Sequence, residues 1–326
     1  MEFIRTFSDL KKNDAAIAGG KGASLGEMTN AGIPVPPGFV VLSAAFEKFL
    51  EATDLNIEID SLLEKVKHED VYSIELASEK IQALIMAAKM PDDIAETIQK
   101  FFHELGTEYV AVRSSATAED SASAAWAGQL DSFLNTTETD LLDKVKKCWA
   151  SLFTPRAIFY RFEQNLHTQK ISVAVVIQKM VVSEVSGIAF SVHPVTQDYN
   201  QLIIEAGFGL GEAIVSGQIT PDSYVVEKEP RRIIDKNVVE QTRGIFRIKG
   251  GGPPSPGASE GQANDWQDIL SGRGSQQKLN DEQILKLSEI ILGIEKHYGF
   301  PCDIEWAYEA GVFYIVQSRP ITTLKK

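Results

Sequence analysis

The sequence CDIEWAYEAGVFYIVQSRPI (residues 302–321) alternates polar and apolar side chains and has the dipeptide Ala-Gly near its centre. This pattern predicts two antiparallel strands joined by a tight turn. On each strand two polar residues lie two positions apart and therefore share one face. These four residues are Asp303, Glu305, Gln317 and Arg319. Carboxylate and carbonyl oxygens are ligands for Mg²⁺, and an arginine guanidinium can bind two phosphate oxygens at once. The hairpin thus predicts a site for a metal ion and a phosphate group.

The length of the turn decides whether the two polar pairs meet. With a two-residue turn, Glu305 lies opposite Val316 and the four polar side chains are split between the two faces. With a three-residue turn at residues 309–311, whose glycine is left-handed, Asp303 lies opposite Gln317 and all four share one face. We predict the three-residue turn. The alternative to a binding site is a polar face that is merely solvated.

Length and charge indicate how many lobes the protein has and which ligands it can bind. The 326 residues are 44% hydrophobic and 24% charged, with a net charge of -13. Because single cores rarely grow beyond ~250–300 residues, we expect two lobes or domains. The negative charge argues against a nucleic-acid surface, since it repels phosphate backbones at long range. An anionic ligand therefore needs a local basic pocket.

Cysteine usage and hydropathy indicate the compartment. The two cysteines, Cys148 and Cys302, have no spacing typical of a zinc site or a disulfide framework. The first residues, MEFIRTFSDLKKND, contain no apolar run of signal-peptide length, and no apolar stretch of the chain is long enough to span a bilayer. We expect a soluble cytoplasmic protein with neither membrane nor nucleic-acid partners.

Two glycine-rich segments invite comparison with nucleotide motifs. AGGKGASLGEMTNAG (residues 18–32) is predicted to be a glycine loop leading into a short helix, but Gly22 stands where a P-loop requires Ser or Thr. GFGLG (residues 207–211) follows a predicted strand but lacks the dinucleotide-binding spacing, because Ile214 replaces the third glycine. By itself, Lys21 is compatible with either a phosphate site or a structural glycine turn.

A third candidate is Arg113, near the end of the predicted strand EYVAVRSS (residues 108–115). The strand leads into a loop rich in Ser, Ala and Gly. An arginine beside many hydroxyl groups and small residues suits anion binding. A salt bridge to Glu119 or Asp120 is the structural alternative.

Seven segments extend the comparison over almost the whole chain: GGKGASLGEM, GIPVPPGF, VRSSATAED, AGQLDSFLN, KCWASLFTPRAIFYR, GLGEAIVSGQITPD and DIEWAYEAGVFYIVQSRPIT. In this order, from about Phe3 to Thr323, they resemble the ATP-binding domain shared by phosphoenolpyruvate synthase, pyruvate phosphate dikinase and rifampicin phosphotransferase. The resemblance implies an α+β ATP-grasp fold, in which two lobes with mixed or antiparallel sheets and helices enclose ATP and Mg²⁺. We expect lobes at residues 1–170 and 171–326, with a mobile insertion at about 249–277.

The resemblance implies roles for residues of the first lobe. Lys21 and Arg113 correspond to phosphate-binding residues and are candidate catalytic residues. Gly128 and Ser132 lie in a loop expected near the nucleotide. Gln178, in VVIQKM, corresponds to the hinge beside the adenine. Phosphoryl transfer depends mainly on positioning and charge neutralisation, which cations in these places supply.

In the second lobe the resemblance coincides with the hairpin pattern. Glu305 and Gln317 correspond to Mg²⁺ ligands, and Asp303 to a supporting acid. Arg319 corresponds to a further phosphate-binding and catalytic residue. The sequence departs from the family pattern in two places. It has AEDSASAAW at residues 118–126, where relatives commonly read AEDLP and have an aromatic residue before the glycine loop, and it has His193, where many have Asn or Asp. His193 is expected to be structural or to lie near the site.

In the family that the sequence resembles, ATP phosphorylates a histidine on a separate swivelling domain, which carries the phosphoryl group to pyruvate or to the antibiotic. None of the five histidines here lies in the glycine-rich context that such a carrier requires; they are His68, His103, His167, His193 and His297. We therefore expect an excised domain or a separate subunit that cleaves ATP and phosphorylates a carrier histidine, with phosphoenolpyruvate synthesis from pyruvate as the first candidate. The alternatives are the ATP-binding domain of a rifampicin phosphotransferase and a non-catalytic ATP-binding module.

Overall fold

The computed structural model describes residues 2–117, 131–166, 171–247, 264–270 and 272–324. The chain forms two compact units. The first comprises Met1–Glu27 and Pro37–Met180, and the second comprises Met28–Pro36 and Val181–Lys326. Each unit contains a sheet whose neighbouring strands are all antiparallel, with helices packed against it, so the expected α+β class is confirmed. Among the described residues no helix has the length and apolar character needed to cross a membrane.

The boundary between the units differs from the expected division at residues 170 and 171. Strand β5 (Val173–Lys179) pairs with β2 (Gly38–Val41) on one side and with β3 (Val110–Ala116) on the other. This strand is therefore central to the first sheet, and the first unit continues to Met180.

The first unit is a five-stranded sheet with the order β1-β2-β5-β3-β4, where β1 is Ile4–Thr6 and β4 is Ser132–Thr136. Its helices are α1 (Ala15–Asn30), α2 (Ser43–Ala52), α3 (Leu55–Leu63), α4 (Val71–Ala87), α5 (Asp92–Leu105), α6 (Glu138–Ala150) and α7 (Pro155–Glu163). Short 3-10 helices occur at Phe7–Asp9, Lys12–Asp14 and Ser151–Phe153.

The two faces of this sheet differ. One face carries Phe39, Val112 and Ile177, which are directly opposed across β2, β3 and β5 and belong to the main hydrophobic core. Phe39 packs against Phe101 of α5 with ring centroids 5.6 Å apart, and helices α2 and α6 contact the sheet as well. Because side chains alternate along a strand, Val40, Arg113 and their neighbours point to the opposite face.

Helix α1 lies on that opposite face, which we call the α1 face. The buried backbone N–H of Gly22 donates to Ser115 Oγ of β3 at 3.3 Å. The sequence predicted a glycine loop before a short helix, but the helix already begins at Ala15. It is interrupted at Gly19, whose φ of 69° and ψ of 170° are not helical. The glycines thus allow a kink within a helix instead of forming a loop before it.

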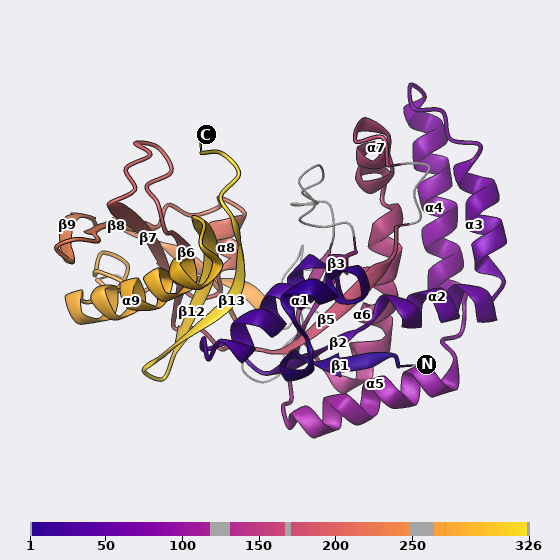
Figure 1. Cartoon of the computed structure of the whole chain (residues 1–326), viewed down its shortest axis with the longest axis horizontal. Helices are drawn as coiled ribbons and strands as arrows, with labels where there is room; N and C mark the ends of the chain where they lie inside the picture. The colour runs from indigo at the N-terminus through magenta and orange to yellow at the C-terminus, as the bar shows by residue number, and fades with distance from the viewer. Residues whose placement is uncertain (1, 118–130, 167–170, 248–263, 271, 325–326) are drawn as a thin grey trace. The chain divides into compact units, whose positions relative to one another are not determined.

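The second unit contains a six-stranded sheet with the order β13-β12-β6-β7-β8-β9. Its strands are β6 (Val185–Phe190), β7 (Gln201–Phe208), β8 (Asp222–Glu227), β9 (Arg232–Asn237), β12 (Cys302–Glu309) and β13 (Val312–Pro320). The short helix α8 (Glu212–Val215) follows β7. Helix α9 (Asp281–Tyr298) begins with a capping box at Asn280 and packs across β12, β7, β8 and β9 (Figure 1). Gln283 of α9 donates to the Tyr308 hydroxyl at 2.9 Å, which identifies the face that α9 covers.

The turn between β12 and β13 has two residues, so the predicted three-residue turn is wrong. Glu309 pairs directly with Val312, and both turn residues have positive φ, 49° at Ala310 and 84° at Gly311. Two positive φ angles are characteristic of the type I′ turn, whose twist matches that of the strands. The N–H of Ala310 also donates to Glu184 Oε1 at 3.0 Å, a contact distant in sequence that stabilises this turn.

A β-bulge brings the four polar side chains to one face, although the predicted pairing is wrong, because Asp303 lies opposite Arg319 and not opposite Gln317. Trp306 pairs with Ile315, and the next pair along the strands is Glu305 with Gln317, so Val316 is the extra residue of the bulge. Because of this extra residue, Glu305 lies opposite Gln317 and not opposite Val316 as a regular two-residue hairpin requires. The two polar pairs therefore share one face, as predicted, although the turn differs.

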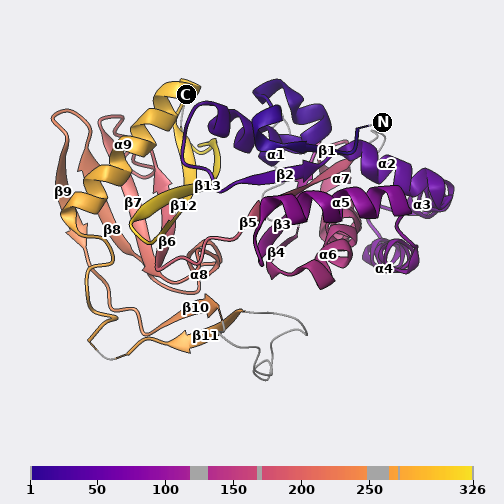
Figure 2. The same cartoon turned by 90° about the horizontal axis from the view of Figure 1, so that it is seen from below.

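The expected insertion at residues 249–277 lies partly outside the described residues, which omit 248–263. Its described part includes regular structure, contrary to expectation. Strand β11 (Asn264–Asp268) pairs with β10 (Arg243–Arg247). Figure 2 shows these two strands projecting from the six-stranded sheet.

A fully buried ion pair holds the base of the β10–β11 ribbon. Lys278 Nζ lies 2.9 Å from Asp222 Oδ1, and both side chains are inaccessible to solvent. The ammonium group also donates to the carbonyl oxygens of Val239 and Gly274. The second Asp222 oxygen accepts from the Tyr224 hydroxyl at 2.7 Å. All three ammonium protons therefore have acceptors, which offsets the cost of burying the charge.

Replacing Lys278 by methionine is expected to lower the free energy of unfolding by about 3–5 kcal/mol, because it leaves the Asp222 carboxylate buried without its counter-charge. Urea unfolding measures this loss. The control is Lys236→Met, which removes an exposed ion pair with Asp281 and should cost less than about 1 kcal/mol. Equal losses in the two variants would contradict a structural role for the buried pair.

Candidate functional site

The residues predicted for the first unit lie on the α1 face where they are described. Arg113 of β3 is directly opposite Ser132 of β4 and Val176 of β5. Gln178 is opposite Ala111, two positions before Arg113, and is buried. Direct pairing and alternation place these side chains on the same side of the sheet. Gly128 was also predicted near the nucleotide, but it lies outside the described residues.

Lys21 lies in the turn of α1 that follows the kink at Gly19, next to Gly22 on the α1 face. Its ammonium charge acts on the pKa of the Cys148 thiol, which burial raises to about 12 and which Ser114 also contacts. The next residue, Gly22, donates to Ser115, so the backbone at Lys21 lies near the part of β3 that carries Arg113. Both cations are half-buried. Reduced exposure to water strengthens their attraction for an anion.

The four polar residues of the hairpin form what we call the hairpin face of the second sheet, opposite α9. Arg319 donates from Nε to Asp303 Oδ2 at 2.9 Å, and its second nitrogen lies 2.8 Å from the same oxygen. The Asp303 side chain is 14% exposed and that of Arg319 is 42% exposed. The acid thus orients the guanidinium, while much of the guanidinium stays accessible to a ligand.

Glu305 lies directly opposite Gln317 across the bulge, and both are half-buried. A carboxylate and an amide oxygen form a donor set that suits Mg²⁺, which commonly takes its remaining ligands from water and phosphate oxygens. The described residues contain no group of three or more His, Cys, Asp or Glu side chains able to hold a metal ion. The pair therefore fits an ion that arrives with a phosphate ligand better than a fully protein-coordinated ion.

The sequence prediction missed Glu205. On the hairpin face this residue of β7 is opposite Ile188 of β6, which is itself opposite Glu305 of β12. Burial raises the pKa of Glu205, and the negative charge of Asp303 raises it further. The sequence indicates Glu205 only as an acidic residue within the apolar segment QLIIEA. Its position near the hairpin depends on the strand order, in which β6 lies between β7 and β12.

The raised pKa of Glu205 predicts a pH dependence in the protein without ligands. The folded state retains the proton to a higher pH than the unfolded state, so this group's contribution to stability falls as pH rises through its folded pKa. Glu205→Gln should therefore raise the urea midpoint at pH 7. The two proteins should converge near pH 4, where the glutamate is largely protonated in both states. A constant difference at all pH values would contradict this account.

His193 has a local structural role. Its Nδ1 lies 3.3 Å from the backbone nitrogen of Val195 and 3.2 Å from that of Thr196, and it accepts a hydrogen bond from each. The imidazole thereby closes the turn that follows β6. This geometry explains a histidine at this position without a contact to a ligand.

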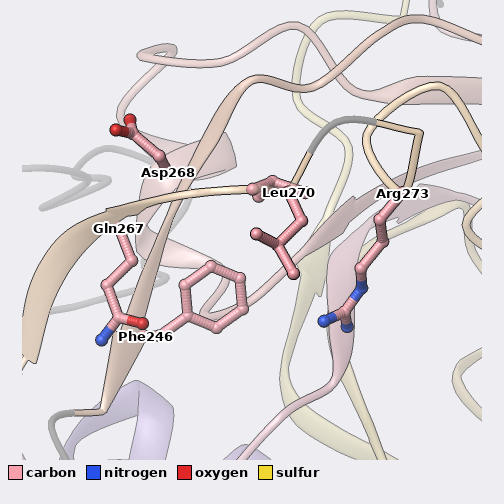
Figure 3. Close-up of a pocket in the computed structure, with 6 residues that line it drawn as sticks. Phe246, Gln267, Asp268, Leu270 and Arg273 are labelled. Carbon is pink, nitrogen blue, oxygen red and sulfur yellow. The ribbon is translucent and has the colours of Figure 1, made fainter.

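A small cavity of about 140 Å³ lies at the β10–β11 ribbon (Figure 3). Phe246 and Leu270 face one another there, and Arg273 lies at one side, while Asp268 points away. Arg273 also lies over the Phe208 ring, 4.9 Å from its centroid. None of the predicted site residues lines this cavity. The cavity is open and is lined by both apolar and polar side chains, and it is separate from the α1 face and the hairpin face.

Comparison with known proteins gives the family. The family described as "Pyruvate phosphate dikinase, AMP/ATP-binding domain" matches residues 15–326. The chain is 44% identical over 333 residues to a protein of Methanocaldococcus jannaschii named "Probable phosphoenolpyruvate synthase", with 100% of this chain and 27% of that protein covered. It is 42% identical over 367 residues to the "Phosphoenolpyruvate synthase" of Pyrococcus furiosus, with 99% and 44% covered.

A relative with a different name is similar to a comparable degree. The chain is 41% identical over 320 residues to the "Rifampicin phosphotransferase" of Bacillus subtilis, with 97% of this chain and 35% of that protein covered. The chain thus spans less than half the length of each of these three relatives. The resemblance inferred from the sequence motifs is confirmed, and the chain belongs to the family of pyruvate phosphate dikinase AMP/ATP-binding domains.

Proposed function

We propose that this chain binds ATP with Mg²⁺ and transfers a phosphoryl group from it to a histidine of a carrier domain. The observation that carries the proposal is the gathering of separate sequence segments on two sheet faces. The α1 face carries Arg113, Ser132 and Gln178, and Lys21 of helix α1 lies on the same face. The hairpin face collects two acids, an amide and a guanidinium. Family membership supports ATP as the nucleotide.

Each proposed role follows from the chemistry of the side chain. Lys21 and Arg113 would bind phosphate oxygens and neutralise their charge, and Arg319, oriented by Asp303, would add a second guanidinium. Gln178 would contact the adenine. Glu305 and Gln317 would hold Mg²⁺, which when bound supplies positive charge to the phosphate oxygens. Since phosphoryl transfer depends mainly on positioning and charge neutralisation, we expect these residues to support transfer from ATP to the carrier histidine.

The final phosphoryl acceptor is proposed from the relatives. Most of those named above are phosphoenolpyruvate synthases, which favours pyruvate as the acceptor. The rifampicin phosphotransferase relative makes the antibiotic the second candidate. We propose that the carrier and acceptor-binding domains belong to the same polypeptide, since these relatives are longer than this chain. A cytoplasmic location fits the use of ATP and the two free, buried cysteines.

The test is a transfer assay with this chain, ATP, Mg²⁺ and a separately supplied carrier domain from a relative. The expected result is that the carrier histidine takes one phosphoryl group of ATP and water takes the other, so that the carrier is labelled and AMP and phosphate are released. The acceptor is then identified by adding pyruvate or rifampicin to the labelled carrier joined to each acceptor domain. Tight binding of ATP without labelling of any carrier would favour a non-catalytic binding module and would overturn the proposed transfer.

A further inference from the structure

Ser115 lies beneath the kink of α1, two residues after Arg113 on β3. We propose that Ser115 is a positioning residue that holds Lys21 in register with Arg113 for phosphate binding. This inference rests on the proposed function, because it assigns Ser115 a role in the same site. Ser115 is not expected to touch the ligand. It acts through the backbone of α1.

The first observation is the close approach of the kink to Ser115. A Cβ atom added at Gly19 would lie 2.1 Å from Ser115 Oγ and 2.4 Å from the Ser115 carbonyl oxygen. Such distances leave no space for a side chain at this position. Gly19 also has a φ of 69°, which glycine adopts without strain. The backbone of α1 is therefore seated directly on Ser115 at the point where the helix is interrupted.

The second observation is a hydrogen bond one residue beyond Lys21. The Gly22 N–H donates to Ser115 Oγ at 3.3 Å in a buried environment. Gly22 cannot move away from the sheet without losing this bond, and a buried N–H without an acceptor is unfavourable. A Cβ at Gly22 would lie 3.1 Å from Val40 of β2, so this turn is also tightly packed. Ser115 thus holds the backbone on both sides of Lys21.

The third observation concerns β3 itself. Residues 113 and 115 lie two apart on a continuous strand, so their side chains share the α1 face. One strand therefore supplies Arg113 directly and determines the position of Lys21 through Ser115. Two cations that bind one anion need a fixed separation, because a displacement of about 1 Å can cost ~10²-fold in rate.

The neighbouring Ser114 provides a matched control. It points to the opposite face, where its hydroxyl lies 2.9 Å from Ser151 Oγ and 3.0 Å from the Asp131 carbonyl oxygen. It is as deeply buried as Ser115, at 1% and 0% exposure. Ser114→Ala therefore removes a comparable buried hydroxyl from the same strand without touching α1.

The experiment compares Ser115→Ala and Ser114→Ala in the transfer assay, with thermal melting as the measure of folding and calorimetry as the measure of binding of a non-hydrolysable ATP analogue. Ser115→Ala is expected to lower kcat about 10-fold to 100-fold and to weaken analogue binding. Ser114→Ala should change kcat less than about threefold at a similar loss of thermal stability. Ser115→Cys retains a weak acceptor and should be intermediate.

A double-mutant cycle with Lys21→Ala separates positioning from general stability. If Ser115 acts through Lys21, Ser115→Ala should change analogue binding less than about twofold once Lys21 is alanine. Equal effects of the two serine variants at matched stability, or an undiminished effect in the Lys21→Ala background, would overturn the inference while leaving the proposed function intact. Unchanged binding and transfer in Lys21→Ala alone would overturn the proposed role of Lys21, and with it the positioning by Ser115.

Discussion

Replacing Glu305 by glutamine is expected to lower the rate of phosphoryl transfer from ATP by about 10²–10³-fold, the range typical for loss of one preorganised electrostatic group. The substitution keeps the size of the side chain and its position opposite Gln317, but it removes the charge proposed to hold Mg²⁺. A neutral amide is a weaker ligand for a hard cation. Raising the Mg²⁺ concentration should therefore restore part of the activity, which the transfer assay measures directly.

The control for this variant is Glu309→Gln. Glu309 lies on the same strand and undergoes the same change of charge, but it pairs with Val312 beside the turn. Its replacement should leave the rate within about twofold, the range expected of a surface change. If Glu305→Gln and Glu309→Gln behave alike, or if Mg²⁺ restores nothing, Glu305 does not hold the metal.

Replacing Arg319 by alanine is expected to have a second effect of similar size, a loss of about 10²–10³-fold in the transfer rate. The guanidinium is proposed to bind a phosphate oxygen, and its removal also leaves Asp303 without its counter-charge beside Glu205. The acid would then repel the phosphates of the nucleotide. Binding of an ATP analogue should weaken along with the rate, as calorimetry can show.

Two further variants sharpen this test. Arg319→Lys keeps the charge but cannot make both of the contacts to Asp303, so it should recover only a small part of the rate. Arg232→Ala removes an arginine that is likewise paired with an acid on an adjacent strand, Glu227, and should leave transfer nearly unchanged. Full activity in Arg319→Ala would remove Arg319 from the site.

The hairpin shows what periodicity can and cannot predict. Alternation of polar and apolar residues correctly predicted both strands and the shared face of the four polar side chains. The turn was predicted wrongly, because Ala310 gives no sign of a positive φ and its contact with Glu184 is distant in sequence. The bulge at Val316 was not predicted either. The shorter turn and the extra residue each shift the pairing by one residue in the same direction, so the shared face is kept, but Asp303 lies opposite Arg319 and not opposite Gln317.

Other features depend on pairings between distant segments. The α1 face could be anticipated only through motif resemblance, because nothing local to Lys21 indicates that α1 packs on β3. Glu205 joins the hairpin face only because β6 lies between β7 and β12. The domain boundary was misplaced because the apolar pattern of β5 does not reveal which sheet the strand enters. Local pattern predicts elements and faces, whereas strand order decides which faces become sites.

The most direct test of the account is a crystal structure of this chain with a non-hydrolysable ATP analogue and Mg²⁺. The account predicts phosphate oxygens in contact with Lys21, Arg113 and Arg319, and a metal ion held by Glu305 and Gln317. An analogue bound elsewhere, for example in the cavity beside Phe246, with these five side chains away from any phosphate or metal, would contradict it.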